Sequence, residues 1–407
     1  MMPGMTLQIA FRNFTRNSRR FILLGLSASV GFFFVCTVQS LVAGLSSQIN
    51  TRGARYYGGH VIISRVQESQ PAMTAAAEDR FIREAISRAG IHPAAISHRT
   101  HFWSQAVVFS NGESVQIRRV IGMDWSTEGV KIRGLQFVSG KPDEMNEPDG
   151  ALISEVTARL LGARVGDQII LQVKRDGGAL NTVPLLVKAV FREVSIFGYY
   201  TVYMDRGVLN RALGKGLDYS ATIGLYLDDY RAAGRIAARL SKALEGRYTA
   251  MPVVTFMPEI STMLRALTLV SYGILALLSL VIAVGILNIY RVIIYERTRE
   301  IGTMRAIGIQ RTQVRNIILC EALYLALCSV AAGLAFSILA LSAVSQIQLS
   351  GAAGFDIFLD RGHLSWVLYP DNVAVDAVLI TLITLFGALG PARSAQRIEP
   401  VVAIRAE

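Results

Sequence analysis

Four long apolar runs are the strongest pattern in this chain. Peptide groups in hydrocarbon find hydrogen-bond partners only within a helix or a closed barrel, so an uncharged apolar run of about 20 residues predicts a transmembrane helix. The fourth run is the weakest, because Asp376 lies one turn inside its start and Gly390-Pro391 lies near its end. We predict membrane-spanning helices at residues 21–45, 266–290, 317–344 and 373–392.

The segment between the first two spans, residues 46–262, has a mixed pattern that predicts a large α+β domain. Ser154 is a plausible helix N-cap with Gly162 after the helix end, and Asp176-Gly177-Gly178 predicts a hairpin turn. The expected strands are 60–64, 115–121, 151–154, 168–173, 183–191, 201–204 and 221–227, and the expected helices are 77–89, 154–161, 205–213 and 229–244.

The first 20 residues precede the first span and carry basic but no acidic side chains. On a helix, Leu7, Ala10, Phe11 and Phe14 share one face, opposite the arginines. This pattern predicts an amphipathic helix over residues 1–20 on the inner membrane surface; a plain basic flank of the first span is the alternative. A cleaved signal peptide is disfavoured, because the apolar run that follows exceeds the roughly 7–15 residues of such a leader.

Arginines also predict the orientation of the spans. They concentrate in residues 1–20, 291–316 and 393–407, and short arginine-rich flanks stay in the cytoplasm. We therefore expect both termini and the 291–316 loop to lie in the cytoplasm, and residues 46–262 and 345–372 to lie outside. Cys36, Cys320 and Cys328 lie in or beside the spans, so the large domain folds without disulfides.

The composition agrees with a membrane protein, since 52% of residues are hydrophobic and only 17% are charged. A net charge of +11 would suit nucleic acid, but the basic residues are spread out or flank apolar runs, so no nucleic-acid partner is expected. His92, His98 and His101 lack the cysteines or the His-Glu-x-x-His spacing of a metal site, and no metal is expected. The spans contain no nucleophile and base pair, so no catalytic residue is expected.

The loop between the second and third spans carries the most specific motif. Residues 296–308 read Glu-Arg-Thr-Arg-Glu-Ile-Gly-Thr-Met-Arg-Ala-Ile-Gly, and Glu321 follows as the third span begins. This resembles the ERxREIGxxRAxG loop of the FtsX-like permease family of ABC transporters. Residues 391–405 resemble that family's tail. Residues 149–154, 158–161 and 166–167 are similar to the MacB-like periplasmic core domain, and we place the chain closest to the lipoprotein-releasing (LolC/LolE) type.

This resemblance implies a coupling helix in the 291–316 loop that docks on a cytoplasmic ABC ATPase dimer. We expect Ile301 and Met304 to be its apolar anchors within a charged rim, Gly308 to end it, and Glu321 to pair with a loop arginine. A solvated arginine-rich loop without a partner is the alternative. The expected coupling residues are Arg297, Arg299, Glu300, Ile301, Gly302, Met304, Arg305, Ala306 and Gly308.

The chain contains no Gly-x-x-x-x-Gly-Lys-Ser/Thr loop, so we expect ATP and Mg²⁺ to bind a separate ATPase subunit and no cofactor to bind here. The resemblance implies further partners: a second permease of the same or a related chain, membrane lipids, and a lipoprotein substrate or periplasmic carrier. The expected function is transmission of ATP-driven motion to the outer domain for lipoprotein release. Export of another periplasmic substrate and FtsX-like activation of a cell-wall hydrolase are the alternatives.

Two further groups are candidate contact surfaces. Gly25, Ala28 and Gly31 are small residues that permit close helix packing, either across a permease dimer or within one chain. The aromatics Phe197, Tyr199 and Tyr200 form either an extracytoplasmic contact or part of the core. Lipoprotein-releasing permeases carry a long hook near the hairpin at residues 174–182, and the short Gly-rich turn here disfavours handover of cargo through such a hook.

Overall fold

The computed structural model describes residues 12, 18–66, 75–103, 106–132, 135–141, 147–175, 177–192, 200–256, 258–348, 359–360 and 362–397. The chain divides into two compact units. The helical unit comprises residues 1–46, 263–349 and 363–407, and the α+β unit comprises residues 47–262 and 350–362. The predicted amphipathic helix at 1–20 lies almost entirely outside the described residues.

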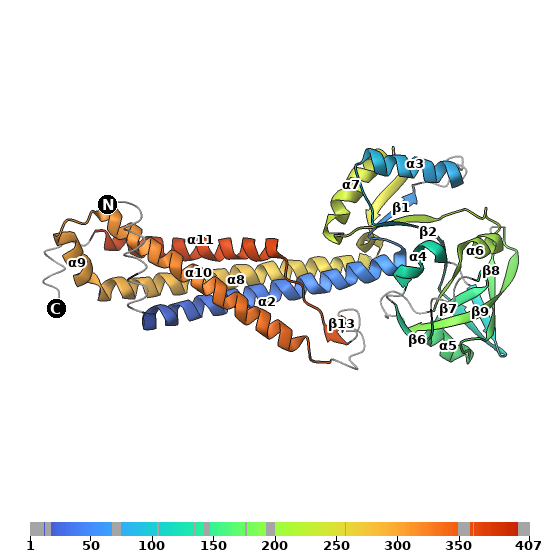
Figure 1. Ribbon diagram of the computed structural model, residues 1–407, viewed down its shortest axis with the longest axis horizontal. Helices are drawn as coiled ribbons and strands as arrows, with labels where there is room; N and C mark the ends of the chain where they lie inside the picture. The colour runs from blue at the N-terminus through green and yellow to red at the C-terminus, as the bar shows by residue number, and fades with distance from the viewer. Residues whose placement is uncertain are drawn as a thin grey trace. The chain divides into compact units, whose positions relative to one another are not determined.

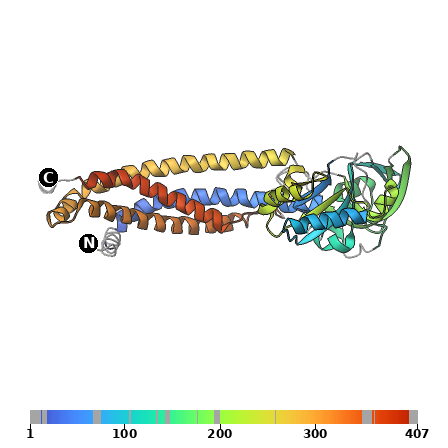
Figure 2. The same ribbon diagram turned by 90° about the horizontal axis from the view of Figure 1, so that it is seen from above.

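Four long helices build the helical unit (Figures 1 and 2): α2 (Ser18–Tyr57), α8 (Pro258–Glu296), α10 (Arg311–Val344) and α11 (Pro370–Ala395). Each is long and apolar enough to cross a membrane, which confirms the prediction of four spans. Each also extends beyond its predicted apolar run, because a helix continues into polar sequence wherever its backbone and side chains find partners. The short helix α9 (Thr298–Ala306) connects α8 to α10.

Small residues set the closest contacts among these helices. A Cβ atom at Gly333 would lie 2.6 Å from the Ser29 carbonyl oxygen, so α10 and α2 approach each other closely there. Gly387 of α11 lies against Ile286 of α8 in a similar way. Around these contacts the buried side chains form one apolar cluster that includes residues from all four long helices and from α9.

The α+β unit contains a sheet in the order β12-β1-β11-β2-β5-β10-β7-β9-β8-β3-β4, with β6 paired to β9. The pairs β5–β10 and β7–β9 are parallel, and the other pairs are antiparallel. The strands are β1 (Val61–Arg65), β2 (Ala95–Phe102), β3 (Ala106–Ser110), β4 (Glu113–Ile117), β5 (Arg119–Met123), β6 (Gln136–Gly140), β7 (Gly150–Ser154), β8 (Gln168–Lys174), β9 (Leu180–Arg192), β10 (Thr201–Asp205), β11 (Thr222–Tyr226) and β12 (Tyr248–Pro252).

Two apolar cores lie along this sheet. Helices α3 (Ala75–Arg88) and α7 (Ala233–Ala243) pack with β1, β11 and β12 around one core (Figure 1). Helices α5 (Glu155–Leu161) and α6 (Arg206–Leu213) pack around the other core, which β3, β4, β5, β7, β8, β9 and β10 line. The remaining elements are α4 (Trp125–Ile132), the 3₁₀ turns η3 (Tyr230–Ala232) and η4 (Val253–Phe256), and the short strands β13 (Leu359–Asp360) and β14 (His363–Leu364).

Several predicted local signals are confirmed. The Ser154 hydroxyl caps α5 by accepting from the Thr157 amide, and Gly162 ends that helix at φ 60°. A short turn joins β8 to β9 as a hairpin, with Gly177 and Gly178 both at positive φ. The predicted strand at 115–121 is instead two strands, β4 and β5, and the pattern misses β2, β3, β6, β12 and α4.

The C-terminal end of α2 is held inside the α+β unit by Arg99 of β2. The guanidinium donates to the carbonyl oxygens of Tyr56, at 2.8 Å, and Arg55, at 2.9 Å. The last four carbonyls of a helix lie beyond its amide donors, so donors from elsewhere stabilise them, and a cation at a helix C-terminus also interacts favourably with the helix dipole. Glu128 of α4 balances the charge, with its Oε2 at 2.6 Å from Nη2 and 2.9 Å from Nε of Arg99. Both side chains are only 1% exposed.

His101, also on β2, makes the stability of the α+β unit depend on pH. Burial, together with the nearby guanidinium groups of Arg99 and Arg119, lowers the pKa of His101 to about 3. The unfolded chain, with an imidazole pKa of about 6.5, therefore takes up a proton first as the pH falls. We expect this group to cost the folded state about 1–2 kcal/mol between about pH 6.5 and pH 5, allowing for the partial exposure of the ring.

Thermal unfolding of the full chain at pH values across that window measures the effect. His101→Gln keeps a donor for Thr222, whose hydroxyl lies 3.0 Å from the His101 Nε2, and should flatten the pH dependence. His92→Gln is the matched control, since His92 is exposed and should leave the profile of the wild type unchanged. Equal pH slopes for wild type and His101→Gln would contradict the assignment.

Candidate functional site

The candidate site is the turn of chain that links α8 to α10 through α9. Arg297 interrupts the helix between α8 and α9, with φ −96° and ψ 12°. The Thr298 hydroxyl donates to the Ile294 carbonyl and thereby satisfies one of the last carbonyls of α8. A capping box formed by Gln310 and Gln313 begins α10. Local hydrogen bonds thus fix the chain at both ends of α9.

Gly308 ends α9, as predicted. Its φ is +97°, a left-handed value that glycine adopts without a Cβ clash. Its amide donates to the Arg305 carbonyl, and the Ile309 amide donates to the Met304 carbonyl at 3.2 Å. These two bonds form a Schellman motif, which satisfies the last carbonyls of α9 and reverses the chain toward α10.

Arg297 connects α9 to α10 through two carboxylates. Its Nε donates to Glu300 at 2.9 Å, and its Nη1 lies 3.2 and 3.1 Å from the two carboxylate oxygens of Glu321. The prediction that Glu321 pairs with a loop arginine is confirmed. Glu321 is 1% exposed, so the ion pair keeps a buried charge from standing alone.

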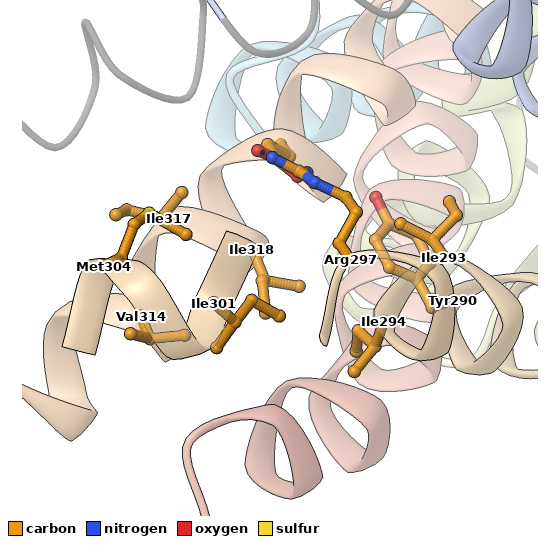
Figure 3. A pocket seen from close by; sticks show the side chains of 10 residues that line it. Tyr290, Ile293, Ile294, Arg297, Ile301, Met304, Val314, Ile317 and Ile318 are labelled. Atoms are coloured by element: carbon orange, nitrogen blue, oxygen red, sulfur yellow. Dashed lines mark hydrogen bonds and ion pairs between the residues drawn. The ribbon is translucent and has the colours of Figure 1, made fainter. Parts of the chain in front are cut away.

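A small apolar cavity lies beside this ion pair. Figure 3 shows Tyr290 and Ile294 of α8 facing Ile301 of α9 and Ile318 of α10 across it. The cavity measures about 20 Å³, which is room for about one water molecule. Among the described residues the hydroxyl of Tyr290 has no hydrogen-bond partner, although the side chain is 1% exposed.

The faces of α9 differ from the expectation. Ile301 is 4% exposed and belongs to the apolar cluster of the helical unit, Gly302 is buried, and Met304 packs against the same cluster. The expectation that Ile301 and Met304 are apolar anchors for a partner is therefore corrected. They hold α9 against its own chain, because the break at Arg297 turns this face toward α8 and α10.

The charged and terminal residues of α9 face outward instead. Arg299, Glu300, Ala306 and Gly308 are exposed. Arg305 is half-buried and donates to the Gln396 carbonyl, just beyond α11, at 3.3 Å. This outer face contains polar and charged groups around a helix terminus, and it is available to a partner.

Two exposed apolar side chains next to this face were not predicted. Tyr295 is 83% exposed and Ile307 is 82% exposed, the two largest values among the exposed large hydrophobic residues described. Ile307 lies six positions after Ile301, which on a helix places it well away from the buried face. That spacing was the signal in the sequence that distinguishes the two isoleucines.

The other predicted contact residues have different positions. A Cβ at Gly25 would contact Leu325 and Ser329 of α10, and one at Gly31 would lie 2.3 Å from Ile282 of α8. Ala28 is 1% exposed. Packing within one chain, the second of the two interpretations, thus accounts for Gly25 and Gly31, and a role at a permease dimer stays a prediction.

The aromatic contact surface is only partly described. Tyr200 has φ +67° and packs against the core that α5 and α6 cover, which agrees with the core interpretation. Phe197 and Tyr199 lie outside the described residues. Within the described part of the chain, no three His, Cys, Asp or Glu side chains are grouped so that they could hold a metal ion.

Two known families match successive parts of the chain. The family described as MacB-like periplasmic core domain matches residues 22–243. The family described as FtsX-like permease C-terminal matches residues 272–400, which include the candidate site. Together the two matches cover most of the helical unit and most of the α+β unit.

Several curated proteins are similar in sequence. The macrolide export ATP-binding/permease protein MacB of Agrobacterium fabrum is 26% identical over 314 residues, which is 72% of this chain and 45% of that protein. The uncharacterized ABC transporter permease YknZ of Bacillus subtilis is 27% identical over 239 residues, or 56% of each chain. This chain spans about half the length of the curated relatives it matches.

One solved structure among the matches is the periplasmic region of MacB from Actinobacillus actinomycetemcomitans. It is 14% identical, with a TM-score of 0.33, and the match covers 51% of this chain and 95% of that one.

Proposed function

Because the chain belongs to the ABC transporter permease family with a MacB-like periplasmic core domain and an FtsX-like C-terminal part, we propose that it transmits ATP-driven motion to its α+β unit. A separate cytoplasmic ABC ATPase dimer supplies the motion, and ATP and Mg²⁺ bind there. A second permease, of the same or a related chain, completes the assembly. The protein lies in the bacterial inner membrane with both termini in the cytoplasm.

The observation that carries this proposal is the position of α9. Its inner face is fixed to α8 and α10 by Ile301 and by the Arg297–Glu321 ion pair. Its outer face leaves Ile307 almost fully exposed beside charged side chains, a composition that suits a protein interface with an apolar anchor and a polar rim. A force on this short helix passes to two long helices at once.

The test is an Ile307→Asp substitution in the full chain, co-expressed with the ABC ATPase that co-purifies with the wild type. Burying isoleucine at an interface contributes about 1.5–3 kcal/mol, so the complex should weaken at least about tenfold. Binding and MgATP hydrolysis by the purified complex are the measurements. Ile347→Asp is the matched control, because Ile347 is also exposed but lies beyond the other end of α10. Equal binding by both variants would contradict the docking surface.

For the cargo we propose lipoproteins released from the inner membrane, because residues 149–154, 158–161 and 166–167 resemble a core domain that lipoprotein-releasing permeases share with MacB. Export of another periplasmic substrate is the second candidate. Two observations favour it: the β8–β9 hairpin ends in a short turn, and the Agrobacterium fabrum relative is named for macrolide export. Deleting the gene for this chain in its host cell distinguishes the two candidate cargoes. Lipoprotein release predicts retention of outer-membrane lipoproteins in the inner membrane, whereas macrolide export predicts increased susceptibility to a macrolide antibiotic.

A further inference from the structure

A second cavity, with a polar lining, lies in the helical unit at the N-terminal end of α11. It measures about 10 Å³, about the volume that one water-sized particle needs. Six of its lining residues carry polar or ionisable groups. They are Cys36, Gln39 and Ser40 of α2, Tyr369 at the N-cap of α11, and Asn372 and Asp376 of α11.

Asp376 is the unusual member of this set. It is 5% exposed, and among the described residues its carboxylate has neither a hydrogen-bond donor nor a basic partner. The favourable field of a helix N-terminus acts mainly within the first turn, and Asp376 is already in the second turn of α11. A bare carboxylate in such a place is costly, so a positive species must neutralise it.

The other groups facing the cavity suggest which species this is. Gln39 and Asn372 offer amide oxygens, Ser40 and Tyr369 offer hydroxyl oxygens, and Cys36 is the remaining ionisable group. Oxygen donors favour hard cations. A single carboxylate and the small volume do not suit Ca²⁺, which takes 6–8 ligands, or Mg²⁺, which keeps several waters.

We propose that the Asp376 cavity binds one small monovalent cation, either a proton or a sodium ion. Its walls come from α2 and from the chain that enters α11, and the Val367 amide donates to the Ser40 carbonyl at 3.1 Å. One turn away, the hydroxyls of Thr37 on α2 and Ser337 on α10 lie 3.0 Å apart. Cation binding therefore stabilises one arrangement of α2 against α11. This proposal goes beyond the proposed function and does not depend on an ATPase.

Thermal unfolding of the purified full chain in detergent tests the proposal. One series replaces choline chloride by sodium chloride at constant ionic strength and about pH 8. The other lowers the pH from about 8 to 6 without sodium, with every protein in this series carrying His101→Gln so that the destabilisation by that histidine is absent. A sodium site raises the wild-type midpoint by about 2–4 °C in the first series, and a proton site does so in the second. Asp376→Asn should respond less in the series to which the wild type responds.

The matched control is Asp371→Asn, which alters an exposed aspartate at the same end of α11 and should behave as the wild type.

If Asp376→Asn does not fold, Ser40→Ala serves in its place. It keeps the carboxylate but removes one neutral ligand, and it should raise the half-saturating sodium concentration about tenfold if the cation is sodium. For a proton, the infrared band of a protonated carboxyl group must appear as the pH falls in the wild type and in Ser40→Ala. The proposal is overturned if the wild-type midpoint changes in neither series. It is also overturned if the Asp376→Asn midpoint changes as much as the wild-type midpoint does.

Discussion

Replacing Arg99 with methionine is expected to lower the free energy of unfolding of the α+β unit by about 3–5 kcal/mol. The substitution keeps much of the side-chain volume but leaves the Glu128 carboxylate, 1% exposed, without its partner. It also removes the donors to the Arg55 and Tyr56 carbonyls at the end of α2. Chemical or thermal unfolding of the full chain in detergent, followed by the near-UV signal of its tryptophans, measures the loss.

A double-mutant cycle separates the ion pair from the helix cap. In Arg99→Met with Glu128→Met, neither charge of the pair remains, and only the capping bonds are lost, which costs about 1–3 kcal/mol. The double variant should therefore be more stable than Arg99→Met alone. Arg83→Met is the control, since the Arg83–Asp79 pair is exposed and contributes less than about 1 kcal/mol. An Arg99→Met protein as stable as Arg83→Met would refute this account of the C-terminal end of α2.

The position of Arg99 also explains why the sequence pattern missed β2. The strand reads Ala-Ile-Ser-His-Arg-Thr-His-Phe, which has no apolar alternation. Ser97, Arg99 and Thr100 are nevertheless buried, because Gly58, the end of α2 and Asn210 supply their hydrogen-bond partners. A pattern of hydrophobic residues indicates burial in apolar cores and does not reveal polar side chains that are buried with partners distant in sequence.

The length of α2 could not be predicted for the same reason. Hydropathy ends the first span near Leu45, whereas the helix continues to Tyr57. Its last residues are polar or charged, and Asn50 and Arg52 are still only 8% exposed. The α+β unit supplies the environment that keeps this segment helical. Signals that depend on a few neighbours, such as the Ser154 cap and the Gly308 helix end, were predictable because their partners are close in sequence.

The candidate site was likewise predictable where its signals are local in sequence and not where they depend on tertiary packing. Its boundaries and the pairing of Glu321 with a loop arginine follow from the motif and from the cost of an unpaired carboxylate. The sequence does not predict which way each face of α9 points. Periodicity places Ile301 and Met304 on one side of the helix, but it does not say whether that side contacts the chain itself or a partner. The break at Arg297 decides this, and it appears only in the backbone angles.

Replacing Arg297 with methionine is expected to separate ATP hydrolysis from motion of the α+β unit. The buried Glu321 carboxylate then loses the Arg297 guanidinium, and α9 loses this ionic connection to α10, at a cost of about 2–4 kcal/mol. The outer face with Ile307 and Arg299 stays in place, so the ATPase should still bind. Hydrolysis by the complex should continue while transport of its cargo falls at least about tenfold.

Two variants make this expectation specific to the ion pair. Arg299→Met removes an exposed arginine two residues away and should change stability by less than about 0.5 kcal/mol, so stability and transport should stay near wild type. Arg297→Lys keeps the charge but not the fork that reaches Glu300 and both oxygens of Glu321, and it should recover stability only in part. Unfolding of the purified chain, ATPase binding and transport are measured for each. If Arg297→Met retained wild-type transport, or lost ATPase binding as Ile307→Asp should, then Arg297 would not be the residue through which α9 moves α10.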